Sequence, residues 1–78
     1  QGVLETTRDI NVYPNPTNNL LNIQAPSEAI TSVYNAFGQI VIEGTMDKVI
    51  DLSELSNGVY QVVIQYSERN IIKKIIKS

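Results

Sequence analysis

The sequence contains no cysteine and no histidine. Without cysteine the chain forms no disulfide and has no thiol nucleophile, and without histidine it lacks the commonest general base and metal ligand. The remaining candidates for acid-base chemistry or metal coordination are the eight acidic side chains. The composition therefore argues against an enzyme, and neither a cofactor nor a bound metal is expected. The absence of cysteine does not distinguish cytosol, periplasm and cell surface.

Charge and long apolar runs are also scarce. The net charge of −2 provides no basic stripe of the kind that nucleic-acid-binding proteins use. No apolar run approaches the roughly 20 residues that span a bilayer, so no membrane insertion is expected. At 78 residues the chain makes one domain with a small core and little room for a deep catalytic cleft. Four of the six basic residues, Arg69, Lys73, Lys74 and Lys77, fall in the last ten residues and form a basic tail.

Short runs rich in Val, Ile and Tyr are present, and Gly, Pro, Asn and Ser separate them. This spacing is typical of a small all-β sandwich or barrel. The final run, IIKKIIK, has helical spacing, but isoleucine is a poor helix former and the run follows a strand by one turn, so a strand is predicted. The expected strands are residues 10–13, 20–24, 29–35, 39–43, 49–52, 58–66 and 71–77.

Turn signals separate these strands. The segment VYPNP, residues 12–16, ends the first strand, because proline donates no ladder hydrogen bond and fixes its own φ. The segment NAFGQ predicts a hairpin in which Gly38 has positive φ. Gly58 follows Asn57 and opens the longest strand, so positive φ is expected there as well. Both glycines are therefore expected to have structural roles.

The acidic residues that could form a site have structural explanations. Asp51 and Glu54 have the spacing of a capping box, which predicts one helical turn near residues 51–55 rather than a catalytic pair. Asp47 and Asp51 could contribute oxygen ligands for calcium, but the spacing of an EF-hand loop is missing. The interpretation is that these carboxylates cap turns.

The aromatic side chains are Tyr13, Tyr34, Phe37, Tyr60 and Tyr66. Such a set could form a sugar-binding platform. Four of them fall inside expected strands and Phe37 falls at a hairpin tip. Packing in the core or along a sheet edge is therefore the preferred interpretation.

Four segments in this order resemble one known family: VYPNPTNNLLNI, VYNAFGQIV, DLSELSNGVYQVVI and a terminal KKIIK. Together they are similar to the type A C-terminal sorting domain of the type IX secretion system of Bacteroidetes. The resemblance covers residues 10–78 and leaves residues 1–9 as a linker from an upstream cargo protein. The chain does not begin with Met and is interpreted as a piece of a longer protein that ends at its native C-terminus.

The resemblance implies an immunoglobulin-like β-sandwich of about seven antiparallel strands and a function as an address for secretion. The cargo would cross the periplasm and then reach the cell surface or the medium. The implied partners are outer-membrane shuttle and translocon proteins and a sortase-like peptidase that removes the domain. The resemblance implies neither binding to nucleic acid nor a cofactor.

The resemblance also assigns roles to individual residues. The terminal strand is the recognition candidate, as an edge strand whose unpaired backbone and basic side chains are read. The doubled IIKK leaves open which lysine corresponds to the motif lysine, and the YPNP segment is interpreted either as a simple turn or as a direct contact. The recognition candidates are Lys73, Lys74, Ile75, Ile76 and Lys77. The other motif residues, mostly structural, are Tyr13, Pro14, Asn15, Pro16, Gly38, Gln39, Asp51, Leu52, Leu55, Gly58 and Tyr60.

Two other functions are compatible with the same fold. The chain could be an immunoglobulin-like or fibronectin-like adhesion or glycan-binding module of a surface protein. It could also be a stabilising domain that packs against a neighbouring catalytic domain. Fold does not discriminate among these functions. Position does, because a sorting domain must end its parent protein.

Overall fold

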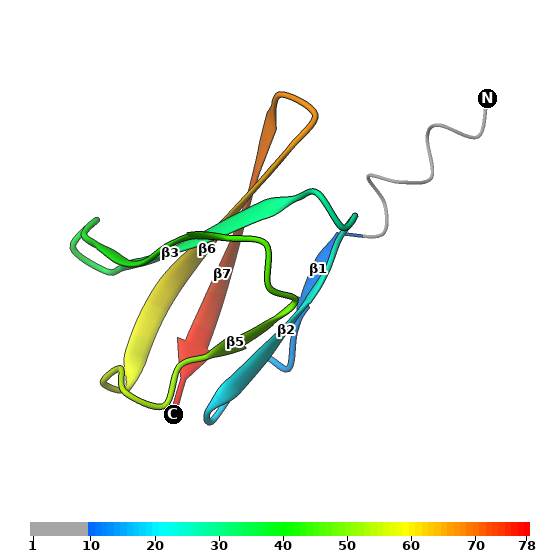
Figure 1. Cartoon of the computed structure of the whole chain (residues 1–78). Helices are drawn as coiled ribbons and strands as arrows, with labels where there is room; N and C mark the ends of the chain where they lie inside the picture. Colours follow the sequence, from blue (N-terminus) through cyan, green and yellow to red (C-terminus); the bar gives the residue numbers. More distant parts are fainter. Residues whose placement is uncertain (1–9) are drawn as a thin grey trace.

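The computed structural model describes residues 10–78, and within that range it contains seven strands and no helix. Every strand expected from the sequence forms, and each boundary lies within two residues of the expected one. The terminal IIKKIIK run is part of a strand, as predicted. The strands are β1 (Asn11–Tyr13), β2 (Leu20–Gln24), β3 (Ile30–Asn35), β4 (Ile40–Thr45), β5 (Val49–Asp51), β6 (Gly58–Tyr66) and β7 (Arg69–Lys77) (Figure 1).

The strands form two antiparallel sheets that pack as a sandwich. One sheet has the order β1-β2-β5 and the other has the order β4-β3-β6-β7. In a constant-type immunoglobulin domain the fourth strand lies beside the fifth. Here β4 pairs with β3 instead and forms an edge of the larger sheet. The immunoglobulin-like sandwich predicted from the sequence is therefore confirmed, with β4 in the second sheet.

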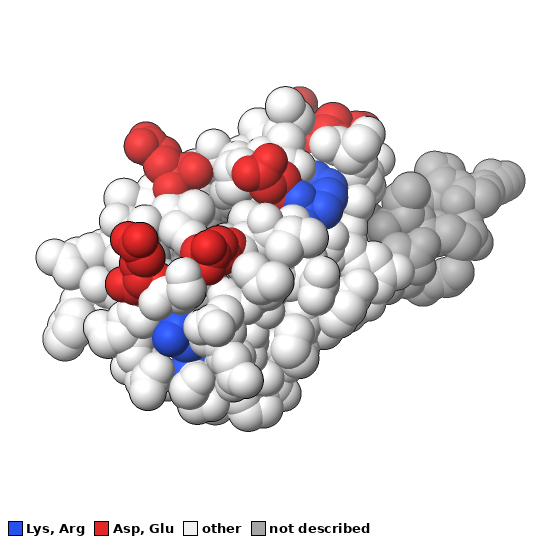
Figure 2. Space-filling model, turned by 60° about the horizontal axis from the view of Figure 1, so that its bottom comes forward, with Lys and Arg blue, Asp and Glu red and all other residues white. Residues whose placement is uncertain are grey.

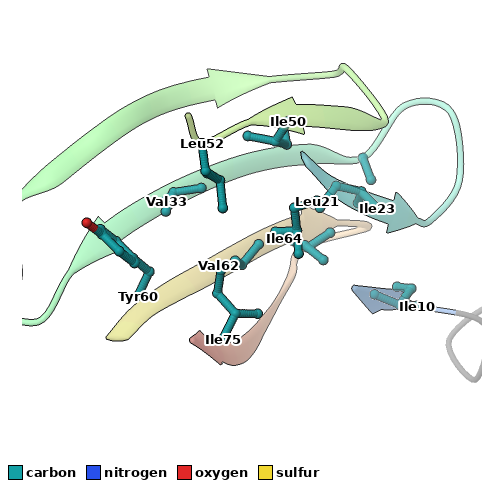
Figure 3. Close-up of a cluster of buried hydrophobic side chains, with 11 residues drawn as sticks. Ile10, Leu21, Ile23, Val33, Ile50, Leu52, Tyr60, Val62, Ile64 and Ile75 are labelled. Carbon is teal, nitrogen blue, oxygen red and sulfur yellow. The ribbon is translucent and has the colours of Figure 1, made fainter. Parts of the chain in front are cut away.

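The core lies between the two sheets (Figure 3). Tyr60, Val62 and Ile64 point into it from β6, because side chains alternate between the faces of a strand. Leu21 and Ile23 of β2 face them from the other sheet. The other buried apolar side chains are Ile10, Ala29, Val33, Ile50, Leu52 and Ile75. Each fully buried aliphatic side chain stabilises the fold by about 1.5–3 kcal/mol.

The crossover from β5 to β6 does not form the helical turn predicted from the sequence. Instead it makes a single turn in which the Leu55 N–H donates to the Leu52 carbonyl over 2.9 Å. Asp51 remains paired with Leu20 in β5, and both leucines of the turn pack on the core. The residue expected to cap a helix is therefore still part of a strand, and the residues after it pack on the core. Asp51 still caps the turn, since its Oδ1 accepts from the Ser53 N–H at 2.9 Å.

Tyr60 fixes the end of this crossover. Its side chain is buried, and its phenol O–H donates to the Ser56 carbonyl over 2.5 Å. A tyrosine near the start of the sixth strand that bonds back to the preceding corner is a hallmark of immunoglobulin-like sandwiches. The motif residue Tyr60 thus makes a structural contact within this crossover.

Candidate recognition site

The segments that carry the sequence motifs gather at one end of the sandwich, although they are far apart in the chain. The antiparallel register places Gly58 opposite Lys77, and Leu20 opposite Asp51. We call this end the motif end and define it as residues 14–19, 35–39, 52–58 and 76–78. The described chain begins at Ile10 at the other end, where β1 starts beside the end of β2 (Figure 1).

The turn that follows β1 lies against the outer edge of β7. The Thr17 N–H donates to the Ile76 carbonyl and the Ser78 N–H donates to the Thr17 carbonyl, both over 2.9 Å. The Asn15 side chain adds two further bonds, accepting from the Ile76 N–H at 3.0 Å and donating to the Lys74 carbonyl at 3.2 Å. The amide of Asn15 therefore takes the place of a strand residue beside β7.

The turn contains two prolines, each of which fixes its own φ. Both the Tyr13–Pro14 and the Asn15–Pro16 peptide bonds are cis. Thr17 is buried, and its hydroxyl donates to the Leu20 carbonyl at 2.6 Å. The turn therefore does more than end β1, because it joins the smaller sheet to the last strand of the larger one.

The unpaired terminal edge predicted from the sequence is wrong for the last residues of the chain. β7 is indeed the edge strand of its sheet. However, the outward-facing backbone groups from the Lys74 carbonyl to the Ser78 N–H have partners in the Asn15–Thr17 turn. Sequence patterning locates an edge strand, but it does not reveal that a distant turn covers that edge.

The lysines of the terminal strand do not form one basic patch. Lys73 and Lys77 share the inner face of β7 with Ile75, whereas Lys74 lies on the outer face with Ile76. Lys77 is only 7% exposed, and its Nζ donates to Asn57 Oδ1 at 3.3 Å. Of the three, Lys74 is the exposed one.

The hairpin between β3 and β4 is held by one asparagine side chain. Asn35 Oδ1 accepts from the N–H groups of Phe37 and Gln39 at 2.9 and 3.0 Å. Asn35 Nδ2 donates to Gln39 Oε1 at 2.9 Å. Gly38 has φ +83°, the positive value predicted from the sequence. The two motif residues of this hairpin, Gly38 and Gln39, therefore have structural roles.

A shallow hollow joins this hairpin to the crossover before β6. Residues 35–37 line one side of the hollow, and residues 56–60 line the other. Gly58 lies in its wall with φ +154°, so the expectation of positive φ is confirmed at this position too. Within the part of the chain that the structure describes, the hollow contains no cluster of acidic side chains that could hold a metal ion.

The sequence interpretation of the aromatic residues is wrong for Phe37. Its side chain is 88% exposed at the hairpin tip and packs neither in the core nor along a sheet edge. Tyr13 is also half exposed, whereas Tyr60 is buried. The hairpin turn leaves the side chain of Phe37 exposed, and periodicity cannot predict that exposure for a residue outside a strand.

Electrostatics at the motif end are weak. The pKa of Asp51 is lowered because the Ser53 backbone N–H and side chain both hydrogen-bond to its carboxylate. Lys77 is almost covered, and the exposed charged side chains at this end are Asp51, at its border, and Glu54. Figure 2 turns this end toward the viewer and shows separate acidic and basic groups on a surface that is otherwise uncharged.

Sequence reasoning missed three residues that build this site. Thr17, Asn35 and Asn57 each connect two of the motif segments or hold one in shape. Asn35 precedes a glycine-containing turn, and asparagine side chains commonly hydrogen-bond to the backbone of such a turn. Thr17 and Asn57 carry no such signal, because their partners are about 60 and 20 residues away in the chain.

Comparisons with known proteins give a consistent result. A family model described as "Secretion system C-terminal sorting domain" matches residues 11–78. Beta-agarase D of Zobellia galactanivorans is 30% identical over 73 residues, covering 92% of this chain and 15% of the agarase. The chain therefore spans only a small part of that relative's length. The family-model match, residues 11–78, includes all four motif segments.

Proposed function

The chain belongs to the family of secretion system C-terminal sorting domains, and we propose that the type IX machinery recognises it as a folded sandwich. Domains of this family are sorting signals for type IX secretion, which leads to the cell surface or the medium. One observation favours recognition of the folded form. β7 is paired with β6 along all nine of its residues, and Ile75 is fully buried. Reading the tail as a free strand would require that sheet to open.

The partners follow from this function. The sorting domain is presented in the periplasm to an outer-membrane shuttle and translocon, and a sortase-like peptidase then removes it. Residues 1–9 serve as the linker to the cargo, although they lie outside the described residues. Ile10 and the motif end lie at opposite ends of the sandwich. A cargo attached before Ile10 would therefore leave the motif end accessible.

The domain acts without catalysis of its own. Asp51, one of the two closely spaced carboxylates in the sequence, is engaged in capping a turn. The segments matched by the family model have structural contacts, as Asn15 and Tyr60 illustrate. These contacts support a domain that functions by presenting a surface for binding.

A fusion experiment tests the proposal. Residues 1–78 are joined to the C-terminus of a fluorescent protein that carries a periplasmic signal peptide, in a bacterium that has this secretion system. We expect fluorescence at the surface or in the medium, and retention in the periplasm when residues 10–78 are removed. Retention of the intact fusion in the periplasm contradicts the proposal.

A second experiment tests whether the basic tail is read through its charge. Lys73→Glu combined with Lys74→Glu reverses the two lysines of β7 that are not buried, and it leaves Lys77 with its Asn57 partner. We expect this variant to melt as the unaltered domain does and to be exported more slowly. Export at the unaltered rate shows that the charge of the tail is not recognised.

A further inference from the structure

We propose that Phe37 is the anchor with which this domain binds its receptor, and that the receptor offers an apolar pocket rimmed by uncharged hydrogen-bonding groups. The inference rests on the function proposed above and specifies its binding surface. Phe37 is 88% exposed, the largest exposed fraction among the large hydrophobic residues of the described chain. Its side chain contributes nothing to the core, so the fold itself does not require an aromatic residue here.

Several hydrogen bonds hold the tip that carries Phe37 in one conformation. Asn35 accepts from the backbone N–H groups of Phe37 and Gln39, and the Gly38 N–H donates to the Asn35 carbonyl at 3.0 Å. A side chain held on an ordered turn loses little conformational entropy when it is bound. Aromatic residues with few rotatable bonds are the usual energetic centres of protein interfaces. Exposure alone is common on protein surfaces, but exposure on a turn held by so many bonds favours binding.

The surroundings of Phe37 define the chemistry of the partner. The hollow beside it is lined by Ser56, Asn57, Gly58 and Val59 from the crossover before β6. Asparagine, serine and tyrosine supply the polar side-chain groups of this hollow, and they offer donors and acceptors without charge. A receptor that fits this surface therefore has an apolar pocket for the ring and neutral polar groups around it.

The opposite end of the sandwich does not share this character. Its turns contain Glu28, Asp47, Lys48 and Glu68, and Arg69 begins β7 at the same end. Charged groups of both signs cover that end, and the described chain begins there at Ile10. The hollow beside Phe37 is thus lined by uncharged residues, and it lies at the end distant from the attachment point of the cargo.

Export of the fluorescent fusion provides the test, with three variants compared. Phe37→Ala removes the ring from a site that is 88% exposed and outside the core, and Phe37→Tyr retains a ring. Met46→Ala is the matched control, because Met46 is a 59% exposed apolar residue at the opposite end. Circular dichroism melting of each purified domain shows whether folding is preserved.

We expect Phe37→Ala to reduce the export rate roughly tenfold or more, as removal of an interface anchor does. Phe37→Tyr and Met46→Ala should be exported close to normally, and all three variants should melt with the unaltered domain. Export of Phe37→Ala at the unaltered rate overturns the inference, and so does an equal defect in Met46→Ala. If the unaltered fusion itself stays in the periplasm, the proposed function fails and this inference fails with it.

Discussion

The two ends of the sandwich differ in how well the residues of their turns suit the backbone conformation there. At the motif end, Gly38 and Gly58 occupy the positions with positive φ, and asparagine side chains hold the turns. At the opposite end, the β6–β7 hairpin places Ser67 and Glu68 at φ +54° and +63° without a glycine. Positive φ is unfavourable for residues with a Cβ atom. The chain therefore has favourable turn residues where a defined surface is presented, and less favourable ones where the hairpin only closes the sheet.

The two ends also differ in what the turns contact. The Asn15–Thr17 turn and the crossover before β6 both bond to β7 across the motif end. These bonds connect segments that are distant in the chain, so the shape of this end depends on the complete fold. A short terminal segment can therefore influence a surface made by several other segments.

The largest expected effect on stability comes from truncating Ile75, the side chain of β7 that is buried in the core. Ile75→Ala should lower the free energy of unfolding by about 3 kcal/mol, because Ile75 is fully buried. Ile72→Ala is the control, since Ile72 lies on the other face of the same strand and is 59% exposed. Its effect should stay within about 0.5 kcal/mol. Urea denaturation measures both, and similar losses would show that β7 is not anchored through its inner face.

Substitution of Gly58 should have the next largest effect. Gly58→Val should destabilise the domain by about 2 kcal/mol because the backbone has φ +154°. No atom lies within 4 Å of the position that a Cβ atom would take, so crowding does not contribute. A chemically synthesised domain with D-alanine at this position accepts positive φ and should retain its stability. Equal melting temperatures for Gly58→Val and the D-alanine form would exclude a backbone origin of the effect.

Loss of the Asn15 side chain should have a smaller effect that is localised to the motif end. Asn15→Ala removes two hydrogen bonds to β7 and should lower stability by about 1 kcal/mol. The Ile76 amide should also exchange with solvent faster, since it loses its acceptor. Asn18→Ala is the control, because Asn18 is an exposed residue of the same turn. Unchanged exchange at Ile76 would mean that the turn does not protect the edge.

Substitutions in the β6–β7 hairpin at the opposite end should increase the stability of the domain. Ser67→Asn combined with Glu68→Gly introduces the residues preferred where both central positions have positive φ. We expect a gain in stability of about 0.5–1 kcal/mol in urea denaturation. Export of the fluorescent fusion should not change, because this hairpin is distant from the motif end. Slower export of a more stable variant would assign a role to the opposite end.

The smallest expected effect is the pH dependence contributed by Asp51. Its pKa is lower in the folded chain because Ser53 hydrogen-bonds to the carboxylate, so this stabilisation is complete above the unfolded pKa, near pH 4. It is lost as the pH falls through the lower pKa of the folded state. Asp51→Asn keeps an oxygen acceptor for the Ser53 N–H but does not titrate. The loss of stability between pH 7 and pH 2 should therefore be smaller in this variant, and equal losses would contradict the assignment.

The sequence by itself determined the local features of this protein. Short runs of β-branched residues located all seven strands, and turn chemistry located the positive φ of Gly38 and Gly58. These features depend on residues that are close in the chain, so pattern and propensity are sufficient to predict them. The order of the motifs also carried the resemblance to a sorting domain, which the family model supports.

Only the tertiary structure decided which segments meet. Which face of β7 packs against the core depends on its register with β6, and that register places Ile75 beside the buried Tyr60. The cover that Asn15 provides over β7 depends on how the two sheets pack, since the residues are about 60 positions apart. The exposure of Phe37 follows from the direction of a turn relative to both sheets. Register, sheet packing and turn direction are long-range properties, and no local pattern in the sequence encodes them.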